Sequence, residues 1–230
     1  MYVLYILLGI AWQWYESASY SRLEQEKLNR RLVQSELATF RAQLNPHFLF
    51  NTLNAISTLI LDKNTSVANE MVSKLSNFLR YSLDKDPMQK VDLDHEINTM
   101  KLYLEIEQVR FDDRLSVAWE IEPRCERALV PSMILQPLAE NAIKHAIATQ
   151  EQGGSITISV NNFAKDLMIE VADDGPGAEI IDGNLYRESG VGLVNTRERL
   201  QALYRQNFSL VVANNTPSGV KVNIRMPFEL

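Results

Sequence analysis

The sequence is poor in cysteine and in excess positive charge, and each shortage excludes a class of protein. Cys125 is the single cysteine among 230 residues. A disulfide framework is therefore excluded, and a reducing compartment is expected. Lys and Arg number 23 against 29 Asp and Glu, which gives a net charge of -6. Because nucleic-acid-binding modules usually carry a basic surface, we expect no direct contact with nucleic acid.

Charge is also missing from residues 1–15, an apolar run that ends in Trp12 and Trp14. As a helix this run would span about 22 Å, short of the ~30 Å hydrocarbon core of a bilayer. We interpret residues 1–15 as the remnant of a membrane segment; a helix lying at an interface or against a partner is the alternative. Basic residues follow, as is typical of the cytoplasmic side of such a segment: Arg22, Lys27, Arg30 and Arg31.

Residues 16–43 contain neither proline nor glycine. Apolar residues at Val33, Leu37, Phe40 and Leu44 repeat at 4-3-4 spacing, the pattern of a two-stranded coiled coil. We predict a coiled-coil signalling helix over 16–44 that pairs with a second copy of the chain. A single amphipathic helix packed on its own domain is the alternative.

Two further helices are predicted over 45–88, the first ending near Asp62 and the second running from about Ser66 to just before Asp86. They would form an antiparallel hairpin, and two copies would make a dimeric four-helix bundle. A third helix is expected from about Asp94 to Phe111.

The apolar period changes after that helix. Residues 115–121 alternate apolar and polar, as in a half-buried strand. Further strands are predicted at 156–160, 167–171, 209–213 and 220–226, with helices from Pro131 to about Ala148 and from Gly192 to Tyr204. The expected fold is α+β: the helical hairpin, then an α/β sandwich over 92–230 in which helices cover one face of a mixed sheet.

Polar residues cluster on the helix expected after Pro131. Asn141, Lys144 and His145 have i, i+3 and i+4 spacing, which places them on one face of an α-helix. Magnesium prefers hard oxygen ligands, so the Asn141 amide is a candidate metal ligand. Lys144 offers a mobile positive charge for phosphate. Taken by itself this segment would more simply be a solvated helix edge.

Two glycine turns follow. Asp173-Asp174-Gly175-Pro176-Gly177 ends a strand with a carboxylate and then allows close approach of a ligand to the backbone. Gly190-Val191-Gly192-Leu193 opens a helix, where unpaired N–H groups favour phosphate.

His47 lies in Asn45-Pro46-His47-Phe48-Leu49-Phe50-Asn51. A neutral imidazole can attack a phosphoryl group, although a lone histidine in an apolar helix is more often a packed residue. Pro46 inside a helix would remove a hydrogen bond at a cost of ~3 kcal/mol, so we expect a kink beside His47.

Taken in order, these motifs resemble the cytoplasmic part of a sensor histidine kinase of the LytS type, in the ATP-binding superfamily of gyrase, Hsp90 and MutL. The resemblance covers residues 33–228. It implies an enzyme that uses ATP and Mg2+ to phosphorylate His47 and then passes the phosphate to an aspartate of a response regulator, which in this family often has a LytTR-type DNA-binding domain. It also implies a homodimer attached to the cytoplasmic face of the bacterial cell membrane.

The resemblance assigns roles to single residues. It implies that Asp173 accepts a hydrogen bond from the adenine amino group. It implies that Asn51 orients the water that removes phosphate from the regulator. It places the nucleotide on a larger set of residues: Asn141, Lys144, His145, Asp173, Gly175, Gly177, Gly190, Gly192 and Leu193. Many histidine kinases have an acidic residue where this chain has Phe48, which leaves the general base unassigned. Glu105 and Glu107 are weak candidates for that base, and we expect both side chains to be solvated instead.

Two alternative functions remain open at this point. The chain could be a non-catalytic, dimeric nucleotide-binding signalling module. It could also be an ATP hydrolase, but gyrase and Hsp90 relatives place a glutamate where this sequence has Pro137.

Overall fold

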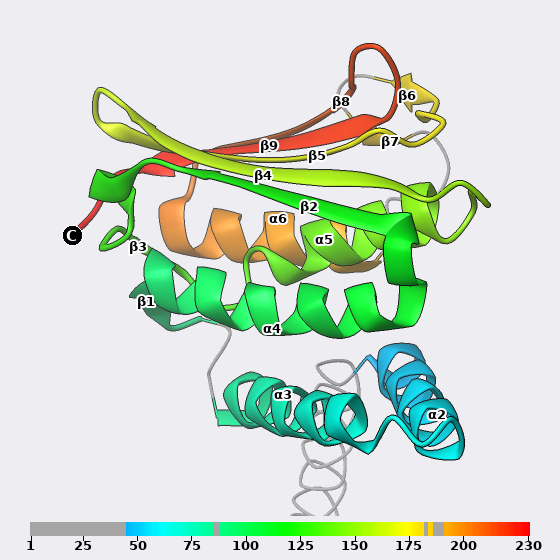
Figure 1. Cartoon of the computed structure of the whole chain (residues 1–230). Helices are drawn as coiled ribbons and strands as arrows, with labels where there is room; N and C mark the ends of the chain where they lie inside the picture. Colours follow the sequence, from blue (N-terminus) through cyan, green and yellow to red (C-terminus); the bar gives the residue numbers. More distant parts are fainter. Residues whose placement is uncertain (1–44, 85–87, 182–183, 186–190) are drawn as a thin grey trace, which may run out of the picture. The chain divides into compact units, whose positions relative to one another are not determined.

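The computed structural model describes residues 45–84, 88–181, 184–185 and 191–230 (Figure 1). The chain divides into two units, 1–47 and 48–230. The segments expected over 1–15 and 16–44 lie outside the described residues, and the domain limits at 45, 88 and 92 stay predictions. Of the helices that the structure describes, none has the length and apolar character needed to cross a membrane.

The first two described helices are α2, Pro46–Leu61, and α3, Thr65–Asp84. The chain leaves α2 through Lys63, whose φ of 60° lies in the left-handed region. There the Asn64 N–H donates to the Leu59 carbonyl at 2.8 Å and the Lys63 N–H to the Ile60 carbonyl at 3.1 Å. This pair of bonds is a Schellman motif, which ends a helix by satisfying its last carbonyls. It turns the chain from α2 into α3.

Pro46 is the first residue of α2, and Asn45 lies outside the helix. A proline at this position removes no hydrogen bond, because the first N–H groups of a helix have no acceptor within it. The expected kink would involve residues 40–44, which lie outside the described residues.

Helix α4, Leu93–Phe111, packs against the helical hairpin through three aromatic rings. The ring centroids of Phe48 and Tyr103 are 4.8 Å apart, and those of Phe78 and Tyr103 are 5.6 Å apart. At the edge of this contact Lys74 on α3 pairs with Glu105 on α4 at 2.9 Å. Since offset aromatic pairs add about 0.5–1.5 kcal/mol beyond their buried area, the cluster fixes α4 against both helices.

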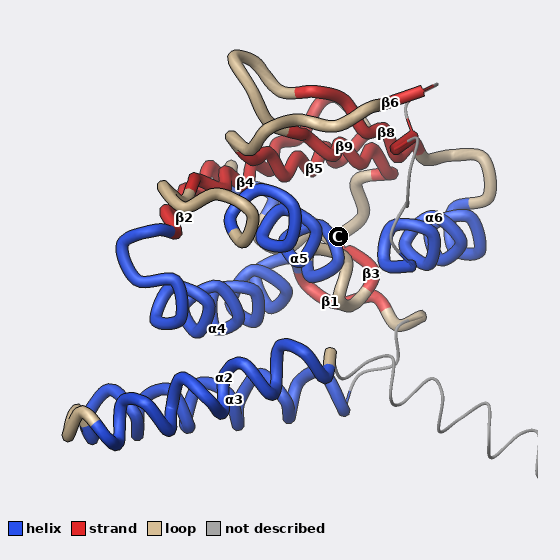
Figure 2. The backbone as a smooth tube through the Cα atoms, turned by 90° about the vertical axis from the view of Figure 1, so that its right-hand side faces the viewer, coloured by secondary structure: helices blue, strands red, loops and turns tan. Residues whose placement is uncertain are grey.

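The largest sheet that the structure describes is mixed, with helices on one face (Figures 1 and 2). Its strands, in spatial order, are β2 (Leu115–Ile121), β4 (Gly154–Phe163), β5 (Asp166–Asp173), β9 (Val220–Pro227) and β8 (Ser209–Asn214). β2 and β4 are parallel and the other neighbours antiparallel. Helices α4, α5 (Gln136–Ala142) and α6 (Val191–Tyr204) lie on the same face of the sheet. The predicted fold class, mixed α/β with N-terminal helices and a helix-covered sheet, is confirmed.

Several short elements are present that the sequence pattern does not predict. β1 (Lys90–Asp92) pairs with β3 (Leu129–Pro131), and β6 (Ile180–Ile181) pairs with β7 (Asn184–Leu185). Two 3-10 turns, η1 (Asp112–Arg114) and η2 (Pro123–Cys125), flank β2. Strands of two or three residues are too short to show a periodic pattern.

The helix expected from Pro131 to about Ala148 ends where predicted, but it starts later and its last turn is not a regular α-helix. Pro131 closes β3, where it pairs with Lys90, and α5 begins five residues later with Pro137 in its first turn. After Ala142 the backbone becomes a π-helix, η3 (Ile143–Ile147), in which the Ala148 N–H donates to the Ile143 carbonyl at 2.9 Å. Of the two prolines, Pro137 is the one that opens the helix, as its fixed φ favours.

Glu107 is buried, although its sequence context predicts a solvated side chain. It lies on α4 with 2% of its side chain exposed and forms an ion pair with Arg110. Burial raises the pKa of Glu107 to about 7; Arg110 opposes this shift and Glu140 adds to it. Glu105, in contrast, is 44% exposed and bonded to Lys74.

The raised pKa of Glu107 predicts how stability depends on pH. Because folding favours the protonated form, its contribution is complete below pH 4.5 and is lost as the pH rises through 7. Between these limits the free energy of unfolding should fall by roughly 3 kcal/mol in the wild type relative to Glu107→Gln. Urea unfolding across this pH range measures the difference. Glu70→Gln, an exposed change on α3, serves as the control; parallel pH profiles of wild type and Glu107→Gln would contradict the assignment.

Candidate nucleotide site

The helix formed by α5 and η3 contacts both glycine turns that the sequence singled out. A Cβ added to Gly192 would lie 3.2 Å from the Cβ of Pro137. A Cβ added to Gly175 would lie 2.5 Å from the Cβ of Ala146 and 2.8 Å from its Cα. The two turns therefore lie against the same helix, one near each end. Asn141 stands between these contacts, one helical turn after Pro137.

Asp173 ends β5 as predicted and is 6% exposed. Its Oδ1 accepts hydrogen bonds from the Gly175 and Val220 N–H groups, both at 3.0 Å. From the described residues no hydrogen bond reaches Oδ2. Burial raises the pKa of Asp173, while its two backbone donors and the nearby His145 oppose the shift. One oxygen thus fixes the carboxyl group, and the second can accept from a ligand.

Asp174 has a different role although it is adjacent in sequence. Its side chain accepts from the Ser155 N–H and from the Ser155 hydroxyl, both at 2.7 Å. These bonds tie the Asp173–Gly177 turn to the start of β4. Asp174 is exposed and fully engaged in this local contact, which leaves Asp173 as the carboxylate of the site.

The turn between β8 and β9 supports Asp173, a contribution that the sequence analysis missed. Asn215 donates through Nδ2 to the Asp173 carbonyl at 2.9 Å, and the Ser218 hydroxyl donates to the Asp174 carbonyl at 3.2 Å. Gly219 has a φ of 102°, and a Cβ there would lie 1.9 Å from the Asp173 carbonyl oxygen. The signal in the sequence is a run typical of turns, Asn214-Asn215-Thr216-Pro217-Ser218-Gly219.

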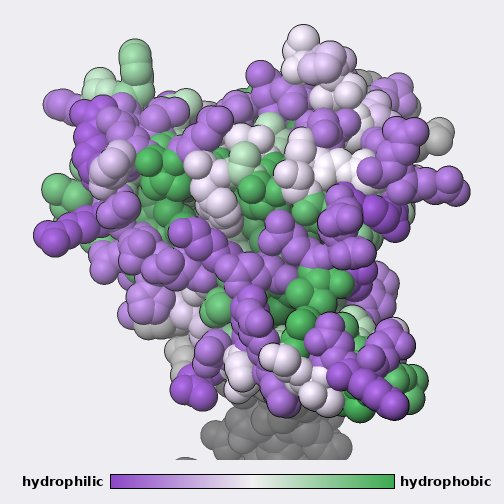
Figure 3. All heavy atoms as spheres, viewed as in Figure 1, coloured by the Kyte–Doolittle hydropathy of each residue, from purple (hydrophilic) through white to green (hydrophobic). Residues whose placement is uncertain are grey.

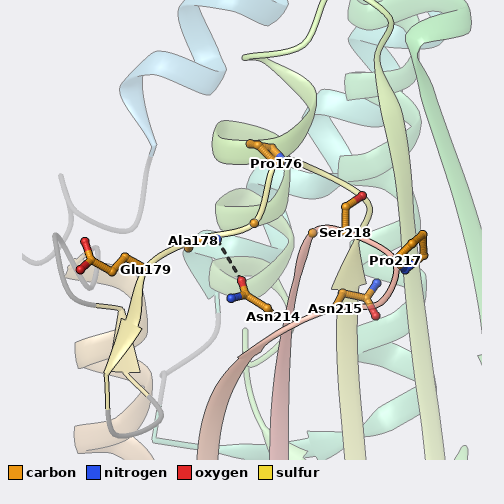
Figure 4. Close-up of a pocket in the computed structure, with 9 residues that line it drawn as sticks. Pro176, Ala178, Glu179, Asn214, Asn215, Pro217 and Ser218 are labelled. Atoms are coloured by element: carbon orange, nitrogen blue, oxygen red, sulfur yellow. Dashed lines mark hydrogen bonds between the residues drawn. The ribbon is translucent and has the colours of Figure 1, made fainter.

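A pocket of about 500 Å³ lies between the Pro176–Glu179 segment and the β8–β9 turn (Figure 4). Asn214 spans it, accepting through Oδ1 from the Ala178 N–H at 3.0 Å. Gly177 lines the pocket with a φ of 81°. Asn141 is not among the lining residues, so this hollow adjoins the Asp173 turn but does not coincide with the site that the sequence predicts.

The remaining predicted nucleotide residues differ in their placement. Asn141 is half-buried on α5, whereas Lys144 and His145 are exposed on η3. The i, i+3, i+4 reasoning applies to a regular α-helix and does not extend into the π-helical segment. Leu193 is 5% exposed and belongs to the hydrophobic core, and Gly190 lies outside the described residues.

His47 and Asn51 belong to α2. His47 is the second residue of that helix and is exposed, and Asn51 is half-buried one turn later. An exposed imidazole can meet a reacting group from outside its own helix, as a phosphate acceptor must.

A metal ion would obtain few ligands from the protein. In the part of the chain that the structure describes, no group of three or more His, Cys, Asp or Glu side chains is arranged to hold one. Magnesium often takes one or two protein ligands and completes its octahedron with phosphate and water. The Asn141 amide oxygen fits that mode of binding.

Comparison with known families agrees with this geometry. Residues 35–115 match the family described as histidine kinase, and residues 128–230 match the histidine kinase-, DNA gyrase B- and HSP90-like ATPases. The second match contains α5, both glycine turns and the β8–β9 turn. The chain belongs to the histidine kinase family, with an ATPase domain of that superfamily.

Among known proteins, the chain is similar to sensor kinases that include the LytS type. It is 35% identical over 190 residues to the sensor histidine kinase YpdA of Escherichia coli K12, covering 80% of this chain and 33% of that protein. It is 33% identical over 220 residues to the sensor protein LytS of Staphylococcus saprophyticus, covering 92% and 37%. It is 34% identical over 209 residues to BtsS, a sensor histidine kinase of Escherichia coli K12, covering 89% of this chain and 36% of that protein. The chain thus spans about a third of the length of these relatives.

The contact between Gly175 and η3 predicts the effect of a single methyl group. Gly175→Ala would place a Cβ within 2.5 Å of Ala146 and push the Asp173 turn away from the helix. We expect a destabilisation of roughly 1–3 kcal/mol and a clear loss of ATP affinity, measured by thermal unfolding and calorimetric titration. Gly192→Ala, whose Cβ would lie 3.2 Å from Pro137, should have a milder effect. Equal, negligible losses in both variants would show that the turns do not pack as described.

Proposed function

We propose that this chain is the kinase portion of a two-component sensor histidine kinase, which binds ATP with Mg2+ and transfers its γ-phosphoryl group to His47. One observation carries the proposal: the α5–η3 helix lies against both glycine turns, with Asn141 between them. The enzyme would be a protein histidine kinase, a phosphotransferase.

The nucleotide would be held by the helix and by the two glycine turns that lie against it. The Oδ2 of Asp173 accepts from the adenine amino group, since Oδ1 is already engaged by two backbone N–H groups. Gly175 and Gly177 let the backbone approach the ligand closely. Gly192, the second residue of α6, would offer its N–H group to phosphate, next to the buried Leu193. The same role is proposed for Gly190, which lies outside the described residues. Lys144 and His145 add exposed side chains that can reach phosphate oxygens.

Mg2+ would bind the Asn141 oxygen together with phosphate oxygens and water. Its charge, when bound, neutralises the developing negative charge on the transferred phosphoryl group.

In the transfer step a nitrogen of the His47 imidazole attacks the γ-phosphorus. A P–N bond forms and the bond between the γ-phosphorus and the β–γ bridging oxygen breaks. The electron pair of that bond stays on the oxygen, which leaves as part of ADP. The ring proton passes to a base that stays unassigned. Asn51, one turn later, would orient the water that hydrolyses the phosphorylated regulator.

A homodimer is proposed from the exposed face of the hairpin. Figure 3 shows hydrophobic side chains at the surface over α2. The large exposed side chains on these helices are Phe50 (67%), Leu53 (48%), Ile60 (55%), Leu61 (79%), Val72 (49%) and Leu83 (42%). Burying a fully exposed side chain of this size is worth roughly 1.5–3 kcal/mol, and each of these would contribute the part of that which corresponds to its exposed surface. A second copy of the hairpin would cover this face as a four-helix bundle.

The dimer proposal predicts the effect of a charge on that face. Leu53→Arg should halve the molar mass measured by light scattering on a size-exclusion column, because an unpaired charge cannot enter an apolar interface. Asn77→Arg on α3 adds the same charge at an exposed polar position and should leave the mass unchanged. A dimer that survives Leu53→Arg would place the interface elsewhere.

The other partners follow from the same proposal. The phosphate of His47 would pass to an aspartate of a response regulator, which would carry a LytTR-type DNA-binding domain, so that the chain itself contacts no nucleic acid. Residues 1–15 would attach the chain to the cytoplasmic face of the bacterial cell membrane.

Incubation with γ-labelled ATP and Mg2+ tests the proposed reaction. We expect an acid-labile, alkali-stable label that is absent in His47→Gln and retained in His95→Gln. Asn141→Ala should lower the label at least tenfold by removing the metal ligand. Released phosphate without labelled protein would instead favour an ATP hydrolase. Unchanged ATP would favour a non-catalytic nucleotide-binding module.

A further inference from the structure

A buried carboxylate outside the nucleotide residues holds the start of the nucleotide helix. Glu96, on α4, is 2% exposed. It accepts from the Met133 N–H at 2.9 Å and from the Leu135 N–H at 3.1 Å. Leu135 is the residue that precedes α5, where N–H groups have no acceptor within the helix. Glu96 therefore caps α5 from a different element.

The segment that leads into α5 is held from two further sides. The Ser132 N–H donates to the Gln89 carbonyl, beside β1, at 2.9 Å. Arg199 on α6 donates to the Ser132 carbonyl. The charge of Arg199 also acts on Glu96, where it opposes the rise in pKa that burial causes. These contacts fix where α5 begins, and Asn141 follows Leu135 by about one and two-thirds turns.

The same carboxylate reaches the helical hairpin. The hydroxyl of Tyr81, on α3, donates to Glu96 Oε2 at 3.2 Å. Burial beside Glu96 raises the pKa of Tyr81 far above its usual value, so the phenol keeps its proton and remains a donor. The Tyr81 ring also stacks on His95 of α4, with ring centroids 5.4 Å apart. Glu96 is thus bonded on one side to α3 and on the other to the entry of α5.

We propose that Glu96 is a positioning residue for the nucleotide helix, and that Tyr81 makes nucleotide binding depend on the position of α3. The inference rests on the proposed function, because it concerns the same nucleotide site. A shift of α3 would alter the Tyr81 bond, change the support of Met133 and Leu135, and move Asn141. By reciprocity, a bound nucleotide would stabilise α3 around Tyr81.

Binding of a non-hydrolysable ATP analogue with Mg2+, measured by calorimetry on the full chain, tests the first half. We expect Glu96→Gln to weaken binding about tenfold, because an amide offers one acceptor oxygen where the carboxylate offers two, so that one of the two backbone N–H groups loses its partner. Tyr81→Phe should weaken it about threefold. The double variant should bind like Glu96→Gln alone, because Tyr81 acts through Glu96. Tyr204→Phe is the matched control, since the buried Tyr204 hydroxyl has no hydrogen-bond partner among the described residues.

Hydrogen exchange tests the second half and does not depend on a fully stable Glu96 variant. In the wild type the analogue should slow exchange in the turns of α3 around Tyr81 as well as in α5. In Tyr81→Phe the protection of α5 should persist and that of α3 should disappear, whereas Tyr204→Phe should keep both. Wild-type affinity in Glu96→Gln, or unchanged α3 protection in Tyr81→Phe, would overturn this inference alone. A wild type that binds no analogue would remove the proposed function and the inference with it.

Discussion

The close contact between the Asp173 turn and the η3 backbone is the constraint on which the site depends. Gly175 leaves no room for a side chain against Ala146, so the turn packs directly on the backbone of the helix. That contact brings the Asp173 carboxyl group to the helix that carries Asn141. Behind it, Gly219 and Asn215 hold the Asp173 backbone from the opposite side. The position of one carboxylate oxygen thus follows from three segments far apart in the sequence.

Buried carboxylates recur in this fold, and each is compensated in a different way. Asp173 has two backbone donors, Glu96 has two backbone donors and a tyrosine, and Glu107 has one arginine. A buried charge without such partners would cost several kcal/mol. A carboxylate with several hydrogen-bond donors holds the segments that carry those donors in place. Asp173 and Glu96 are therefore suited to positioning the groups of the nucleotide site. Burial raises the pKa of all three carboxyl groups, and it raises that of Glu107, which has a single charged partner, to about 7.

Periodicity predicted the long elements, and it failed where contacts distant in sequence decide the conformation. The helices α2, α3, α4 and α6 and all five sheet strands were expected close to their observed limits. The alternation of β2 is the clearest apolar repeat, whereas α6 was expected from the glycine turn that opens it. Pro131 was misplaced because its strand exists through pairing with Lys90, 41 positions earlier, which no local pattern reveals. The Asp173 turn could be predicted from its own residues. Glu96 and the β8–β9 turn could not, since they support the site from other segments.

A crystal structure with a non-hydrolysable ATP analogue and Mg2+ tests the central claim most directly. The account predicts the adenine amino group within hydrogen-bonding distance of Asp173 Oδ2, the metal on the Asn141 oxygen, and phosphates at the start of α6. A nucleotide bound instead in the pocket between Pro176–Glu179 and the β8–β9 turn, with Asn141 making no contact to metal or phosphate, would contradict it.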